Sequence, residues 1–329
     1  MNKTLKIILN ISVFILIAGF GTYMIRSIFT SEETKRIDTE PSGISEESPY
    51  KKTDQWDATS EIIRFDIHES GIYMALSDRI SVFDTTGKHL RDFNIEPNAR
   101  DIKVDDSGIY ILFPNRIALY SFIGEKKDEW EACSENSDYC SFTITNDYFF
   151  VTDAENKLIW QYDKQGQLVR FIKSPDGFVI PSYSFDIINL NDTLYCSNSG
   201  RHKIESYTLK GEFISSFGII GTQAGAFSGC CNPVYLEKTG TGNLITSEKG
   251  NPRISCYGRD GKFHTILFDS KILGSGTSAY EIHISGERIY IASKKTISVY
   301  EIDPNRTGKS CIGCEEYCPV RERIKNKNK

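Results

Sequence analysis

Cysteine is the residue type in this sequence with the widest range of chemistry, and its spacing is uneven. The 329 residues include nine cysteines, of which Cys230 and Cys231 are neighbours in the polar segment 228–233. Exposed thiols outside the cytoplasm are usually oxidised. The adjacent pair could therefore form a vicinal disulfide, bind a metal ion or pair with other cysteines.

Three further cysteines lie close together near the carboxy terminus. Cys311, Cys314 and Cys318 are followed directly by Pro319. Their spacing resembles the latter part of the bacterial ferredoxin pattern, whose cysteines ligate iron–sulfur clusters, but Gly308 stands where the first cysteine would be. The resemblance implies an iron–sulfur site that lacks one ligand. Zinc with a fourth ligand from elsewhere, disulfides and free thiols are also compatible with the spacing.

The remaining cysteines favour structural roles. Cys133 and Cys140 are separated by six residues and are the simplest candidates for a disulfide. Cys196 and Cys256 fall within apolar strand patterns, where a cysteine acts as a small core residue.

No complete catalytic signature accompanies these thiols. The sequence has no G-x-S-x-G, H-E-x-x-H, P-loop or EF-hand motif, so whether the chain is an enzyme stays open. A net charge of −5 gives no reason to expect nucleic acid as a partner.

The elements that must position these residues are short strands in a repeated order. Alternating apolar runs, rich in aromatic and β-branched residues, are separated by turns with Gly and Asp, which is typical of antiparallel strands. An aromatic residue closes the second run of each unit, at Phe83, Tyr120, Tyr162, Tyr207, Tyr257 and Tyr300. The mean period is about 43 residues, within the range of four-stranded propeller blades. The pattern predicts an all-β, six-bladed β-propeller, with an open β-sandwich as the alternative.

The links between repeats resemble those of the NHL family. Residues 209–218, followed by Gly221, Gly225 and Phe227, carry the resemblance, and a looser D-x-x-G-x-x-x-x-x-F pattern recurs at residues 163–171 and 260–268. The resemblance implies a propeller over about residues 59–305, but it identifies the fold rather than a function.

The last repeat lacks a fourth strand. A propeller must close its ring to avoid an exposed sheet edge. We therefore expect residues near Trp56 to Ile63 to supply the missing outer strand.

The order of strands within a propeller blade would bring two loops of the fifth repeat and one of the fourth to the same face of the disc, which we call the rim. The residues concerned are Cys230, Cys231, Asn232, Glu248, Lys249, Arg253, Arg201 and His202. With Arg253 taken as a solvated loop charge, this cationic rim favours an anionic ligand or a protein partner. The same residues are also common in ordinary turns.

The amino-terminal segment predicts a membrane anchor. From Ile7 to Ile25 no residue is charged, and a helix of that length spans roughly 28 Å, close to the thickness of a bilayer core. Lys3 and Lys6 outweigh Arg26, which predicts a cytoplasmic amino terminus and an extracytoplasmic (periplasmic) body. A cleaved signal peptide is the alternative.

The sequence thus divides into a transmembrane signal anchor (1–30), a flexible tether (31–58), the propeller (59–305) and a basic tail with cysteines (306–329). We predict a membrane-anchored binding or scaffold module. The alternative is an accessory protein of an extracytoplasmic redox system, with an iron–sulfur cluster or zinc at the carboxy-terminal cysteines.

Overall fold

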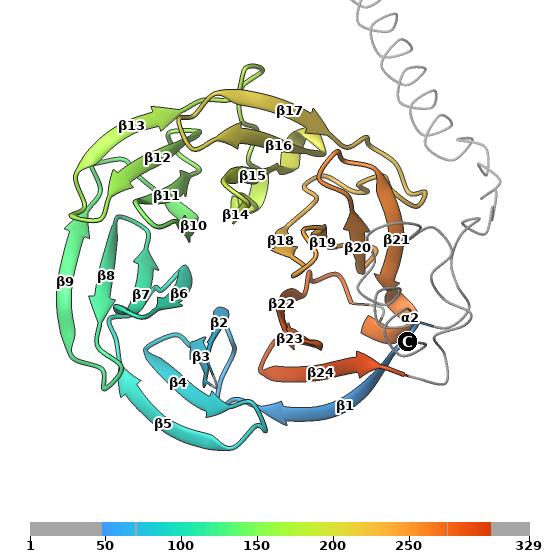
Figure 1. Cartoon of the computed structure of the whole chain (residues 1–329), viewed down its shortest axis with the longest axis horizontal. Helices are drawn as coiled ribbons and strands as arrows, with labels where there is room; N and C mark the ends of the chain where they lie inside the picture. The colour runs from blue at the N-terminus through green and yellow to red at the C-terminus, as the bar shows by residue number, and fades with distance from the viewer. Residues whose placement is uncertain (1–47, 70, 275, 304–329) are drawn as a thin grey trace, which may run out of the picture. The chain divides into compact units, whose positions relative to one another are not determined.

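The computed structural model describes residues 48–303 except 70 and 275. These residues form six four-stranded antiparallel sheets that surround a central axis like the blades of a propeller (Figure 1). The predicted six-bladed all-β fold is therefore confirmed. In the described part of the chain, no helix is both long and apolar enough to span a membrane. Residues 7–25 and the three carboxy-terminal cysteines lie outside the described residues.

Within each blade, the strands follow one another from the central axis to the outer edge of the disc. The first three blades are β2 (Arg64–His68), β3 (Gly71–Ala75), β4 (Arg79–Asp84) and β5 (His89–Asn94); β6 (Asp101–Asp105), β7 (Gly108–Phe113), β8 (Arg116–Tyr120) and β9 (Lys126–Glu131); and β10 (Tyr139–Ile144), β11 (Tyr148–Asp153), β12 (Leu158–Asp163) and β13 (Leu168–Ile172). The next two are β14 (Ile187–Leu190), β15 (Thr193–Asn198), β16 (Lys203–Thr208) and β17 (Phe213–Phe217); and β18 (Tyr235–Lys238), β19 (Leu244–Glu248), β20 (Arg253–Tyr257) and β21 (Phe263–Phe268). The sixth is β22 (Glu281–Ser285), β23 (Arg288–Ser293), β24 (Thr296–Ile302) and β1 (Tyr50–Asp57). Short helices lie at η1 (Pro181–Tyr183), η2 (Ser199–Arg201) and α2 (Ser270–Leu273).

The core lies between neighbouring blades, and the repeated aromatic residues help to fill it. All six are buried near the end of the third strand of their blade: Phe83, Tyr120, Tyr162, Tyr207, Tyr257 and Tyr300. Their regular spacing therefore reflects a packing position that recurs in every blade.

The Asp and Gly of the NHL-like pattern have a direct structural reason. The Asp163 carboxylate accepts hydrogen bonds from the backbone N–H groups of Gln165 and Gln167, which fixes the turn after β12. Gly166 in that turn has a positive φ of 74°, and a Cβ there would lie 1.9 Å from the Trp130 ring of the preceding blade's outer strand. Only glycine allows this approach. This turn thus packs the third blade against the second.

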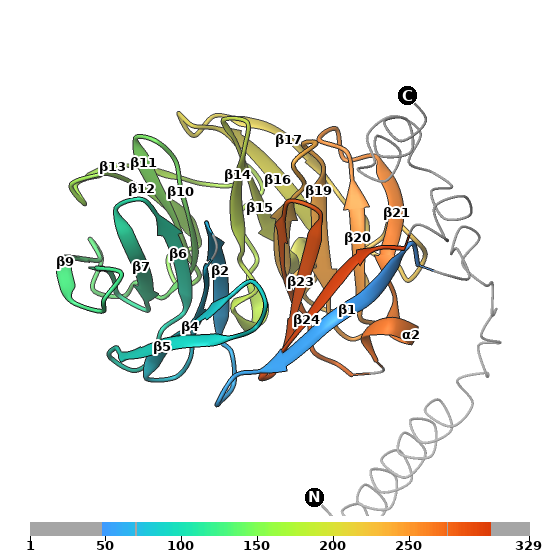
Figure 2. The same cartoon turned by 60° about the horizontal axis from the view of Figure 1, so that its bottom comes forward.

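The ring closes through the amino-terminal segment, as predicted, but with an earlier strand. β1 spans Tyr50–Asp57 and pairs antiparallel with β24, with Trp56 opposite Ile297 (Figure 2). Residues 58–63 instead connect β1 to β2, where Ala58 and Ile62 are buried. Most of β1 is exposed and polar, so residues 50–55 lack the apolar alternation of a strand and resemble a continuation of the polar segment before them.

Candidate functional site

The inner strands surround a polar cavity of about 990 Å³, which we call the funnel. Its wall is built from the inner strand of each blade. Its mouth is lined by residues of the loops that join inner to second strands or third to outer strands, such as Asp147, Asp192 and Lys210. We call this end of the disc the funnel face.

Arg64 forms the floor of the funnel. Its guanidinium lies 3.0 Å from Asp101, 2.8 Å from Asp186 and 3.1 Å from Glu281, so it joins four blades across the axis. The guanidinium also lies over the Tyr235 ring, 4.7 Å from the ring centroid. Charge-assisted contacts of this kind are strong in a buried setting. Arg64 therefore separates the funnel from a smaller cavity of about 220 Å³ on the opposite side.

The floor carboxylates also connect the blades through backbone hydrogen bonds. Glu281 accepts from the N–H of Phe65, and Asp186 accepts from the N–H of Leu236. Asp101 likewise accepts from the N–H of the next inner strand in the ring. One oxygen of each carboxylate is thus occupied in holding the ring together.

Glu281 keeps one oxygen for other partners. Its Oε1 is buried but accepts no hydrogen bond from the described residues. Arg64 Nε is 3.1 Å away but donates its single N–H to Asp101 instead. A buried carboxylate oxygen without a donor is unfavourable. This atom faces the cations of Arg64 and His283 without accepting a hydrogen bond from either, so it retains lone pairs for a further donor.

His283 lies one step above the floor, among three carboxylates. Its Nδ1 is 3.1 Å from Glu237 and 3.7 Å from Asp66, and its Nε2 is 3.6 Å from Glu281. Burial alone would lower the pKa of His283, but the close contacts with Glu237 and Glu281 and the nearby negative charges outweigh it and raise the pKa to about 10. His283 is therefore an imidazolium at neutral pH.

The charged groups around the floor do not cancel. Burial would raise the pKa of Asp101 and of Glu237, but the neighbouring cations lower both values, so these carboxyls stay ionised. Five carboxylates face three cations here: Asp66, Asp101, Asp186, Glu237 and Glu281 against Arg64, Lys103 and His283. The floor and wall thus carry an excess of negative charge.

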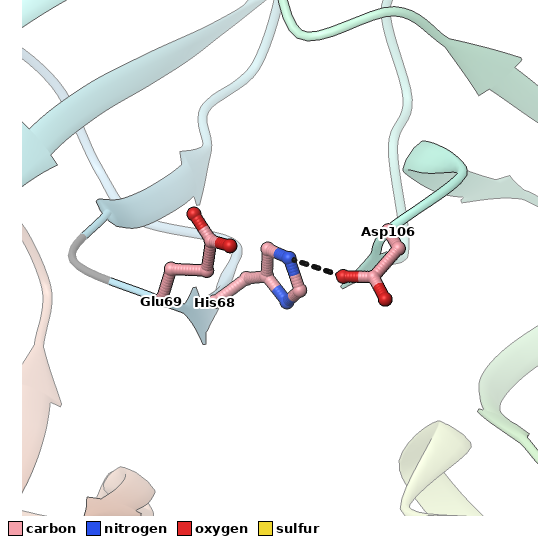
Figure 3. Close-up of side chains that lie close together, drawn as sticks. All are labelled: His68, Glu69 and Asp106. Atoms are coloured by element: carbon pink, nitrogen blue, oxygen red, sulfur yellow. Dashed lines mark ion pairs between the residues drawn. The ribbon is translucent and has the colours of Figure 1, made fainter.

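The funnel face also carries a group that could hold a metal ion, outside the lining of the funnel itself. Ligand atoms of His68, Glu69 and Asp106 all lie within 4.8 Å of one another, and His68 Nε2 is 3.2 Å from Asp106. Figure 3 shows the three side chains where the neighbouring inner strands β2 and β6 end. One imidazole with two carboxylates suits a divalent ion such as zinc. Glu69 and Asp106 are exposed, however, and exposed acidic groups are common without any ion.

The predicted rim lies at the other end of the disc, which we call the thiol face. It carries the loops that join outer to inner strands and second to third strands, including the loops of Cys230 and Lys249. The Asn232 side chain donates to the carbonyls of Ser228 and Lys249 and accepts from the Lys249 N–H. His202 Nε2 contacts the Gly229 carbonyl from the neighbouring blade. The structure therefore brings these loops together, as expected.

The cations of the rim, however, are engaged within the protein. Arg253 is buried and forms an ion pair of 2.8 Å with the fully buried Glu248. It also donates to the backbone carbonyls of Thr222 and Gln223. The expectation that Arg253 is a solvated loop charge was wrong. Arg253 is the first residue of β20, the third strand of its blade, and its side chain is buried. Arg201 also donates to backbone, at the Gly177 carbonyl. The rim thus gives little support for an anionic ligand.

The described cysteines are all free thiols. Cys196 and Cys256 are buried in the core, as predicted. Cys133 and Cys140 do not form the expected disulfide: Tyr162 donates to Cys133, while Cys140 contacts the Asp138 carbonyl from within β10. Cys133 lies in the loop after β9, whereas Cys140 lies within β10. Cys230 and Cys231 remain close together, with their sulfur atoms 3.1 Å apart.

Comparison with known proteins supports the fold. No known protein family and no curated protein matches the sequence. Virginiamycin B lyase from Staphylococcus aureus is similar in structure, with a TM-score of 0.54 and 16% identity over 77% of this chain and 100% of the lyase. The WD40 domain of Neurospora crassa Pan2 has a TM-score of 0.55 and 9% identity, over 77% of this chain and 95% of that domain. At these identities the likeness shows a propeller fold alone.

Proposed function

We propose that this protein is a binding propeller whose funnel holds an organic cation, such as an ammonium or guanidinium group. The excess of carboxylates on the floor and wall carries the proposal. Buried negative charge is unfavourable unless a cation pairs with it. A ligand cation in the funnel would supply that partner, and Glu281 Oε1 would accept a hydrogen bond from it.

The whole funnel has the same charge preference. Its lining includes eight carboxylates, from Asp66, Asp105, Asp147, Asp186, Asp192, Glu212, Glu237 and Glu281. Its lysine and arginine side chains are those of Arg64, Lys103, Lys210 and Lys238. A cavity lined mainly by one sign of charge concentrates ligands of the opposite sign. Binding, rather than proton abstraction, also fits the floor, because the imidazolium of His283 has no free nitrogen to act as a base.

Calorimetric titration with two probes tests the ligand class. Spermidine carries ammonium groups, and citrate is an anion of similar size. At equal ionic strength we expect spermidine to bind and citrate to give no heat of binding. A lysine-containing peptide serves as a third probe; tighter binding than spermidine would indicate a protein partner. Preference for citrate over both cations would refute the proposal.

The membrane anchor is the second part of the proposal. The uncharged segment 7–25 and the lysines before it support a single membrane pass with the propeller on the extracytoplasmic, periplasmic side. Protease added to intact spheroplasts should then digest the propeller, whereas a cytoplasmic control protein should survive. Protection of the propeller in intact spheroplasts, with digestion only after lysis, would overturn this orientation.

A further inference from the structure

The adjacent thiols on the thiol face are arranged as an accessible and an inaccessible sulfur in contact. Cys230 is exposed, whereas Cys231 retains 1% of its accessible surface. Their sulfur atoms are 3.1 Å apart, roughly one ångström longer than a covalent S–S bond. A reagent in solution can therefore reach Cys230 but not Cys231.

The loop that carries the pair is held at both ends. Asn232 fastens it to the Lys249 backbone, and His202 contacts the Gly229 carbonyl. These contacts come from two different blades. The loop is therefore anchored on both sides of the pair, as a site on a rigid scaffold requires.

The surroundings of Cys231 favour its thiolate. Burial would raise the pKa of Cys231, but hydrogen bonds from Lys249 and Cys230 and the Lys249 charge lower it overall. The hydrogen bond to Cys231 in turn raises the pKa of Cys230. Of the two thiols, Cys231 therefore loses its proton more readily, which suits it to attack once Cys230 has reacted.

We propose that Cys230 and Cys231 form a thiol–disulfide exchange site that reduces small external disulfides. Cys230 loses its proton to solvent and attacks one sulfur of the external disulfide, forming a mixed disulfide and releasing the first thiolate. Cys231 then loses its proton to that thiolate and attacks Cys230 Sγ, releasing the second thiolate, which takes a proton from solvent. The pair is oxidised to a vicinal disulfide, and the external disulfide is reduced to two thiols. This activity lies on the opposite face from the proposed cation site and does not depend on it.

Peptide mass mapping of the full-length protein can test this site without interference from other cysteines. Cleavage after lysine and arginine releases residues 211–238 as one peptide, whose only cysteines are Cys230 and Cys231. The reduced protein is exposed to glutathione disulfide, quenched with acid and mapped. We expect this peptide to lose the mass of two hydrogen atoms and to regain it with dithiothreitol.

Two serine variants test the order of the steps. Cys231→Ser should keep one glutathione on Cys230, because no second thiol can release it. Cys230→Ser should stay unmodified over the same time, because Cys231 is buried. A wild-type peptide that stays reduced, or that keeps glutathione without forming the vicinal disulfide, would overturn the proposal. So would equal glutathione incorporation in the two variants.

Discussion

The two faces of this propeller use charged residues in different ways. On the thiol face, Arg253 and Glu248 neutralise each other, and Arg201 is engaged by a backbone carbonyl. On the funnel face, carboxylates outnumber the cations that face them. Paired charges hold loops and blades in place but leave little net charge to attract a ligand. The comparison teaches that a charged loop identified in a sequence indicates a binding site only if its charge is not already balanced within the fold.

Among substitutions on the two faces, removal of the Arg64 cation should cause the largest loss of stability. Arg64→Met leaves Asp101, Asp186 and Glu281 around the axis without their central partner. Unpairing a buried charge costs about 3–5 kcal/mol, so we expect at least that loss in the free energy of unfolding by urea. Arg79→Met is the matched control, because Arg79 forms an exposed pair with Asp78 and should change stability little. Equal effects would show that the floor network is not structural.

Arg253→Ala should show that the thiol face is built from balanced charge. The variant leaves Glu248 buried without its ion pair, and we expect a loss of about 3 kcal/mol in the free energy of unfolding. The double variant Arg253→Met/Glu248→Leu removes both charges and should recover most of the loss. A single variant as stable as the wild type would restore Arg253 as a candidate ligand-binding residue.

Alkaline pH should weaken the funnel face specifically. The pKa of His283 is raised from 6.5 to about 10 in the folded protein. Its stabilising contribution is therefore fully present below about pH 6.5 and is lost as the pH rises toward 10, by up to about 1.4 kcal/mol per pH unit. Urea titrations from pH 6 to 10 should show this decline in the wild type, and a smaller one in His283→Gln. Parallel profiles for the two proteins would contradict the assignment.

The fold could be predicted because its signals recur in every repeat. The buried aromatic of the third strand is present in all six blades, and in four of them a Gly turn also receives an aromatic ring, as Gly166 does from Trp130. The closing strand begins earlier than predicted. Because β1 is nearly all polar and exposed, it has no apolar alternation that would mark its position in the sequence. Its position is set by pairing with β24, a contact across almost the whole sequence.

The funnel could not be predicted from any one stretch of sequence, because its polar residues come from short segments of all six blades. Arg64 and Asp66, Asp101 and Lys103, and Glu281 and His283 occupy the same two positions of their inner strands. No single segment looks like a site. Aligning the repeats on their inner strands would have exposed the signal, since polar residues two apart share one side of a strand. Whether a rim charge is buried, as for Arg253, depends on the tertiary fold and leaves no local signal.

Spermidine titration of two matched double variants tests most directly which face binds the ligand. Asp147→Asn/Asp192→Asn removes two exposed carboxylates from the funnel mouth. Glu135→Gln/Glu155→Gln removes two exposed carboxylates from loops of the thiol face. Both pairs change the net charge equally, so a general effect of charge would weaken both alike. We expect the mouth variant to bind spermidine about tenfold more weakly than the wild type, and the thiol-face variant to bind as the wild type does. Equal affinities for the two variants would contradict the funnel as the binding site.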